Sequence, residues 1–188
     1  MLPGVYQAKK KDNTIYFRSS ITYSGKHISL GSFDTEEKAH EAYLYAGRLL
    51  AGKEITLTSY KKENPVLSFS KWVSLINFRD NGIYIKTPIY LFQKYFHNYY
   101  FSPENYLIFD TDDLFYYSTR TISRRGGHLF VADYGMQVNI LSRYGIKNYA
   151  VAGRDYLFAN GNTRDFRDRK STRLNSSHKV QSRMPSSA

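Results

Sequence analysis

The stretch from Ile15 to Gly52, IYFRSSITYSGKHISLGSFDTEEKAHEAYLYAGRLLAG, contains two different hydrophobic periods. Apolar and polar residues alternate over 15–22 and again over 26–30, which is typical of half-buried strands. Ser24-Gly25 between them is a turn sequence. From Ala39 onward, apolar residues recur every three or four positions, which predicts an amphipathic helix. The stretch therefore predicts two strands followed by a helix.

The flanking residues complete a small core. A first strand is predicted over Gly4–Gln7, and Asp12-Asn13 separates it from the second. Asp34 with Glu37 three positions later is a helix N-cap pattern, and Gly52 is a natural stop. The fold class predicted is α+β, with a three-stranded antiparallel sheet packed on one helix and a second small α+β domain after it.

Charge is divided between these two layers. Residues 1–30 contain five basic side chains and one acidic side chain, whereas residues 34–48 contain four acidic and two basic ones. The sheet thus carries a net charge of +4 and the helix a net charge of −2. A basic surface attracts polyanions over long distances, so the sheet is the face expected to meet phosphate.

This N-terminal part resembles the plant-type Apetala/ethylene-response-factor DNA-binding domain, which also occurs beside homing endonucleases of phages and bacteria. The matching segments are Gly4–Tyr6, Phe17–Ile21, Leu30–Thr35 and Ala39–Tyr43. The resemblance implies that the sheet lies in the major groove of double-stranded DNA and that its outward side chains read bases. By position, those side chains are Tyr6, Ala8, Ser20, Thr22, His27 and Ser29. Most base-reading arginines of the plant family are absent here, so its target sequence does not transfer.

The candidate DNA-binding residues are most of these positions and the cations expected near them. They are Tyr6, Lys9, Lys10, Arg18, Ser20, Thr22, Lys26, His27 and Ser29. We expect double-stranded DNA as the partner, bound with or without strict sequence preference. Such binding suits a transcription regulator or a DNA-binding protein of a mobile element.

The sequence predicts domain boundaries at 1–58 and 67–167, with a linker over 59–66 that contains Pro65. Four segments of the second domain resemble, in order and spacing, the HNH homing-endonuclease domain, here truncated at its end. These segments are Leu107–Asp113, Gly126–Val131, Ile140–Arg143 and Asn160–Arg167.

The chemistry that this second resemblance implies needs two histidines, one as general base and one as metal ligand. Ser142 stands at the first position and Phe158 falls near the second. Serine is a poor base and phenylalanine cannot bind a metal, so we expect no catalytic residue, no metal ligand and no cofactor. The alternative is an HNH-type metal-dependent homing endonuclease with non-standard catalytic residues, which would use Mg²⁺.

Two further segments carry local predictions. Asp110, Asp112 and Asp113 could bind a divalent cation, but a solvated acidic turn is the favoured interpretation because no other ligand spacing accompanies them. Thr87-Pro88, followed by apolar side chains at 89, 91, 92 and 95, predicts a helix that begins at the proline.

Composition excludes several classes of protein. The absence of cysteine excludes disulfides, thiol catalysis and cysteine-bound zinc. No apolar run approaches the ~20 residues of a membrane span. We therefore expect no membrane partner and a cytoplasmic, DNA-associated location.

Residues 168–188 can be read, as two blocks in one consistent frame, as a translation of a widely used sequencing adapter. We expect this tail to be disordered and the native sequence to be interrupted near Arg167. The tail contains five basic residues and one acidic residue, so of the formal charge of +11 the other 167 residues carry +7.

Overall fold

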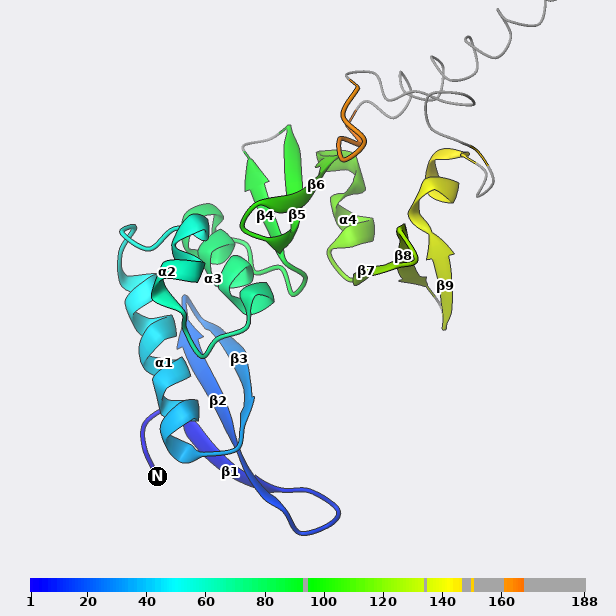
Figure 1. Ribbon diagram of the computed structural model, residues 1–188. Helices are drawn as coiled ribbons and strands as arrows, with labels where there is room; N and C mark the ends of the chain where they lie inside the picture. Colours follow the sequence, from blue (N-terminus) through cyan, green and yellow to red (C-terminus); the bar gives the residue numbers. More distant parts are fainter. Residues whose placement is uncertain (93–94, 134, 147–149, 151–160, 168–188) are drawn as a thin grey trace, which may run out of the picture. The chain divides into compact units, whose positions relative to one another are not determined.

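The computed structural model describes residues 1–92, 95–133, 135–146, 150 and 161–167 (Figure 1). Two compact units are present: one comprises Met1–Tyr90 and Tyr100–Asn105, the other the described residues of Leu91–Tyr99 and Tyr106–Ala188. In the described part of the chain, three three-stranded sheets and four α-helices confirm the α+β class. The adapter-like tail lies outside the described residues.

The elements follow one another as three groups. The first group is β1 (Val5–Lys9), β2 (Ile15–Tyr23), β3 (Lys26–Phe33), α1 (Glu36–Ala51), η1 (Leu57–Ser59), α2 (Tyr60–Glu63) and α3 (Phe69–Asn81). A second sheet contains β4 (Ile89–Phe92), β5 (Phe96–Ser102) and β6 (Asn105–Asp110) in that order. The last group is η2 (Thr111–Asp113), α4 (Leu114–Tyr117), β7 (Ile122–Arg125), β8 (His128–Asp133), β9 (Met136–Asn139) and η3 (Ile140–Tyr144).

The first sheet is antiparallel with the order β1-β2-β3, as the alternating pattern predicts. Ile21 pairs with Ile28, and Ile28 and Leu30 are buried beneath α1. From α1, five of the six residues that the three-and-four spacing placed inward are buried, and the sixth, Tyr43, is partly buried against the same core. The five are Ala39, Ala42, Ala46, Leu49 and Leu50. Alternation in the strands and helical spacing in α1 therefore build one shared core.

Helix α1 begins one residue later than the sequence predicts. Thr35, not Asp34, is the N-cap, and its Oγ1 accepts a hydrogen bond of 3.2 Å from the Lys38 N–H. Asp34 instead pairs with the ammonium group of Lys38 at 3.0 Å. Asp34 and Thr35 are both residue types that cap helices, so the sequence alone did not distinguish between them. In the structure, Thr35 has the extended backbone of an N-cap and makes the capping hydrogen bond.

The core of the first unit extends well past the boundary that the sequence predicts at residue 58. Trp72, Leu75 and Ile76 of α3 lie in the same buried cluster as Ile28 and Leu49. The indole N–H of Trp72 donates to the Thr56 carbonyl at 3.1 Å. Residues 59–66, expected as a linker, contain α2 and lead directly into α3.

Arg79 fixes the carboxyl end of α1 from α3. Its Nη1 donates to the carbonyl oxygens of Leu49, Gly52 and Ile55 at 3.1, 2.8 and 2.7 Å. Its Nε pairs with Asp80 at 2.8 Å, and the side chain is almost fully buried. The carbonyls of Leu49 and Gly52 are among those that a helix end leaves without intrahelical partners, and the Ile55 carbonyl belongs to the segment that follows, so α3 completes α1 as well as its core.

The prediction that a helix begins at Pro88 is wrong, because Ile89–Phe92 is strand β4. The Tyr100 N–H donates to the Pro88 carbonyl at 2.8 Å. The apolar run was too short for its pattern to distinguish a helix from a strand. The segment forms a strand because it pairs with β5, which follows it in the chain.

Candidate nucleic-acid interface

Nine side chains share the face of the first sheet that points away from α1, which we name the outer face. Its members are Tyr6, Ala8, Tyr16, Arg18, Ser20, Thr22, His27, Ser29 and Ser32. The register aligns Tyr6, Arg18 and Ser32 in one row across three strands. Because successive strand residues point to opposite sides, burial of Val5, Ile28 and Leu30 on α1 turns this set toward solvent.

A β-bulge determines which residues of β3 belong to the outer face. Ser19 pairs with Gly31 and Ser20 pairs with Ser29, so β3 contains one extra residue at this point. Gly31 has a φ of +126°, a backbone conformation that disfavours a side chain. The bulge keeps Leu30 and Phe33 inward while both Ser29 and Ser32 face outward.

Two side-chain contacts order the outer face. Arg18 Nη2 donates to the Tyr16 hydroxyl at 2.8 Å, and its guanidinium lies 5.6 Å from the centre of the Tyr16 ring. Across the strands, Thr22 Oγ1 and His27 Nδ1 are 3.4 Å apart. Arg18 thus has a partly fixed orientation while remaining exposed.

The structure brings together five of the candidate residues as exposed members of the outer face: Tyr6, Arg18, Thr22, His27 and Ser29. Ser20 is on this face but is only 8% exposed. Lys10 lies in the turn between β1 and β2.

Two candidate lysines lie on the opposite side of the register. Lys9 pairs with Ile15, and Lys26 pairs with Tyr23. The Lys26 ammonium lies 5.3 Å from the centre of the Tyr84 ring. Both lysines were predicted to lie near the outer face because they are close in sequence to outward residues. The alternation of side chains along each strand instead places them on the opposite side of the sheet.

Tyr16 and Ser32 are outer-face residues that the candidate list lacked. Tyr16 lies two positions before Arg18, so the alternating pattern already predicts that both side chains lie on the same face of the strand. Ser32 could not be found in this way, because the bulge reverses the parity of β3 beyond Leu30.

The charges around the outer face have one dominant sign. Arg18 is its permanent cation, and none of its nine members is acidic. The adjoining turn contains Lys10, Lys11 and Asp12. Hydrogen bonds from Thr14 lower the pKa of Asp12, so this carboxylate stays charged and offsets one lysine. On α1, Glu37 and Glu41 are exposed on the other layer.

The HNH-like positions in the second unit have structural contacts. The Ser142 hydroxyl donates to the Asn139 carbonyl at 2.6 Å, and Phe158 lies outside the described residues. Asp113, expected in a solvated turn, is fully buried and pairs with Arg143 at 2.9 Å. In the described ranges, no group of three or more His, Asp or Glu side chains is arranged to hold a metal ion.

Comparisons with protein-family models, curated proteins and solved structures gave no match to this chain. None of the helices described is both long enough and apolar enough to cross a lipid bilayer.

Proposed function

We propose that the first unit binds double-stranded DNA through the outer face of its sheet. The observation that supports this most is the exposed row of Tyr6, Arg18 and Ser32, on a face whose members include no carboxylate. A guanidinium donates in a fork that matches phosphate oxygens. The exposed hydroxyls of Thr22 and Ser29 add neutral donors beside it.

Phosphate contacts supply most of the affinity in this proposal, because the face offers one guanidinium. Arginine makes the strongest direct contact with a base edge, by a bidentate bond to guanine. With Arg18 as the face's only arginine, backbone contacts outnumber base contacts. The protein would therefore act as a regulator or mobile-element protein that binds many duplexes, with a salt dependence set by the number of its phosphate contacts.

The proposal does not extend to DNA cleavage. Ser142 already donates its hydroxyl proton to a backbone carbonyl, and serine is too weak a base to activate water.

Fluorescence anisotropy of the full-length chain with a labelled duplex tests this proposal. Arg18→Glu should weaken binding about tenfold or more, because it removes a charge-assisted contact and places an anion at the phosphate surface. The log–log slope against salt should fall by about one unit.

Lys38→Glu provides the matched control, since it makes the same charge change on α1, where Lys38 is exposed. We expect a small loss from this variant, because a charge on the far layer is screened within about 10 Å. Equal losses from both variants would show that only net charge matters, and the outer face would then not be the interface.

A further inference from the structure

Three side chains of the first unit gather on the α3 side of the β2–β3 turn, and we name them the Tyr84 cluster: Lys26, Lys71 and Tyr84. Lys26 begins β3, Lys71 lies in the first turn of α3, and Tyr84 follows that helix. The ammonium groups of Lys26 and Lys71 lie 5.3 and 5.4 Å from the centre of the Tyr84 ring. Lys71 Nζ also lies 2.7 Å from the Tyr84 hydroxyl. Two cations from distant parts of the chain thus share one aromatic ring.

Aromatic packing holds the Tyr84 cluster against the core of the first unit. Tyr23, which pairs with Lys26 across the turn, lies edge-on to Phe78 of α3, with the ring centres 5.4 Å apart. Phe78 in turn lies edge-on to Tyr84, with the ring centres 5.9 Å apart. Phe78 is buried, and both tyrosines pack against the same core. This row of three rings therefore fixes the position of Tyr84 relative to the end of the sheet.

Neither ammonium group of the cluster is paired with a carboxylate in the part of the chain that the structure describes. Asp80, the acidic residue of α3, pairs instead with Arg79 at 2.8 Å. An aromatic ring attracts a cation through its negative face but does not cancel the charge, as a carboxylate would. The ring of Tyr84 therefore holds the two ammonium groups without neutralising them.

The hydrogen-bonding groups of the cluster can all donate. An ammonium group has no lone pair, so Lys71 donates to the Tyr84 oxygen, and the Tyr84 hydroxyl proton stays available for another acceptor. This contact uses one of the three N–H bonds of Lys71. Lys26 is exposed and adds a second charged donor. Charged donors beside a hydroxyl are a combination with which proteins bind phosphate oxygens.

The cluster lies at the end of the sheet where the outer face also ends. His27, the residue after Lys26, belongs to the outer face and pairs with Thr22. Lys26 points to the α3 side of the same turn, so the two surfaces meet at Ser24-Gly25. Duplex DNA carries one phosphate charge for about every 1.7 Å of its axis. A duplex that lies on the outer face and extends past this turn therefore presents phosphates to the cluster.

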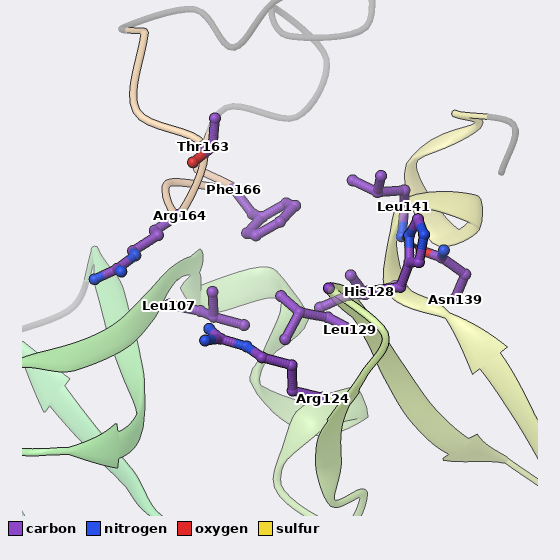
Figure 2. A pocket seen from close by; sticks show the side chains of 11 residues that line it. Leu107, Arg124, His128, Leu129, Asn139, Leu141, Thr163, Arg164 and Phe166 are labelled. Carbon is purple, nitrogen blue, oxygen red and sulfur yellow. Dashed lines mark hydrogen bonds between the residues drawn. The ribbon is translucent and has the colours of Figure 1, made fainter. Parts of the chain in front are cut away.

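The Tyr84 cluster is distinct from a pocket of about 270 Å³ in the second unit, whose described lining includes Arg124 and Arg164 (Figure 2). Most of the residues that line this pocket fall in the segments that resemble the HNH domain, so a ligand bound there would belong to that resemblance. Lys71 and Tyr84 instead follow Tyr43, the last residue that matches the Apetala-type domain. These two cluster residues thus lie outside both resemblances.

We propose that the Tyr84 cluster binds the phosphate backbone of the same DNA duplex, so that the interface continues from the outer face around the β2–β3 turn onto α3. Lys26 and Lys71 each neutralise a phosphate, and the Tyr84 hydroxyl donates to a phosphate oxygen. This inference rests on the function proposed above and adds a second contact surface to it.

Anisotropy titrations of the full-length chain with a labelled duplex, repeated over a range of salt concentrations, test the proposal. Lys26→Gln and Lys71→Gln should each lower the log–log slope against salt by about one unit and weaken binding about fivefold at about 0.1 M salt. Glutamine is used because a glutamate would form an ion pair with the remaining lysine. Tyr84→Phe retains the ring and removes the hydroxyl, so it should weaken binding about twofold without changing the slope.

Lys62→Gln is the matched control, because Lys62 is an exposed lysine of α2 outside the cluster. It should leave the slope unchanged. An unchanged slope for both Lys26→Gln and Lys71→Gln would overturn the proposal, and so would an equal decrease for Lys62→Gln. Melting curves show whether each variant folds. If Lys71→Gln fails to fold because this lysine is half-buried, Lys26→Gln on the exposed surface decides alone.

Arg18→Glu separates this proposal from the one on which it rests. If Arg18→Glu weakens binding and the two lysine variants do not, the outer face remains the interface and the cluster is not part of it. If the lysine variants weaken binding and Arg18→Glu does not, the cluster contacts DNA and the outer face is excluded. If the unmodified chain does not bind the duplex, both proposals fail.

Discussion

The outer face of the first unit and the ion pairs of the second unit place charged side chains in different surroundings. In the first unit, Arg18 is exposed on the outer face, and the carboxylates of α1 lie on the other layer. In the second, Asp113 and Asp165 are buried, and each is paired with an arginine. Charges kept in water cost little and remain available to a partner, whereas buried charges require fixed counterions. Exposed charge thus marks the candidate surface around Arg18, whereas the buried pairs of Asp113 and Asp165 are structural, like the Arg79–Asp80 pair of the first unit.

The largest expected effect is on the buried ion pair of Asp113. Asp113→Asn leaves the Arg143 guanidinium without its charged partner and weakens the carboxylate's contact with the Tyr144 hydroxyl. Burial raises the pKa of both Tyr117 and Tyr144, whose hydroxyls are 2.7 Å apart, so neither tyrosine can supply a negative charge instead. We expect a loss of about 3–5 kcal/mol in unfolding free energy, measured by urea denaturation.

Asp34→Asn is the control from the first unit, because the Asp34–Lys38 pair is exposed. Exposed pairs contribute little, so no measurable change is expected. If the two variants proved equally stable, the contrast between a buried network and solvated charges would fail.

The next effect concerns His97, which is fully buried beside Phe109 and Tyr117. Burial lowers the pKa of His97 from 6.5 to about 4, and neither ring nitrogen has a hydrogen-bond partner among the residues that the structure describes. The folded state therefore favours neutral His97. Its contribution is fully present above pH 6.5 and is lost as pH falls toward 4, by up to about 3 kcal/mol.

His97→Phe removes this titration, and unfolding free energies of both proteins from pH 7 to pH 4 measure it. The difference between wild type and variant should change steadily below pH 6.5. A constant difference across the range would show that His97 does not titrate in this window.

The smallest effect concerns the orientation of Arg18. Tyr16→Phe removes the hydroxyl that accepts the Arg18 hydrogen bond but retains the ring. Because this contact is exposed to water, we expect duplex affinity to fall about twofold, with little change in stability. Anisotropy titrations of both proteins measure this. A loss as large as that from Arg18→Glu would mean that Tyr16 itself contacts DNA.

Local patterns were sufficient for the first sheet and α1. Alternation over Ile15–Tyr23 and the three-and-four spacing from Ala39 follow directly from the geometry of strands and helices. The outer face follows from the same alternation, including Arg18, Thr22 and His27. The bulge at Gly31 could not be predicted in this way, because it reverses parity within an otherwise regular strand.

Local sequence patterns did not predict the features that depend on contacts between distant residues. The polar stretch ending at Pro65 has the composition of a linker, yet Trp72 packs in the first core. Asp113 belongs to an acidic turn, and its burial depends on distant partners that include Arg143 and Tyr144, thirty and thirty-one positions later.

Arg79 determines where the chain can be divided for experiments. Its three bonds to the carbonyls of Leu49, Gly52 and Ile55 connect the end of α1 to a residue of α3. A fragment ending near residue 62 would retain the whole sheet but lose Arg79 and Trp72, exposing apolar surface and unpaired carbonyls. Such a fragment would aggregate or be degraded even if its interface were intact. Dissection of this protein should therefore retain α3, and weak binding by a shorter piece would report its instability rather than its affinity.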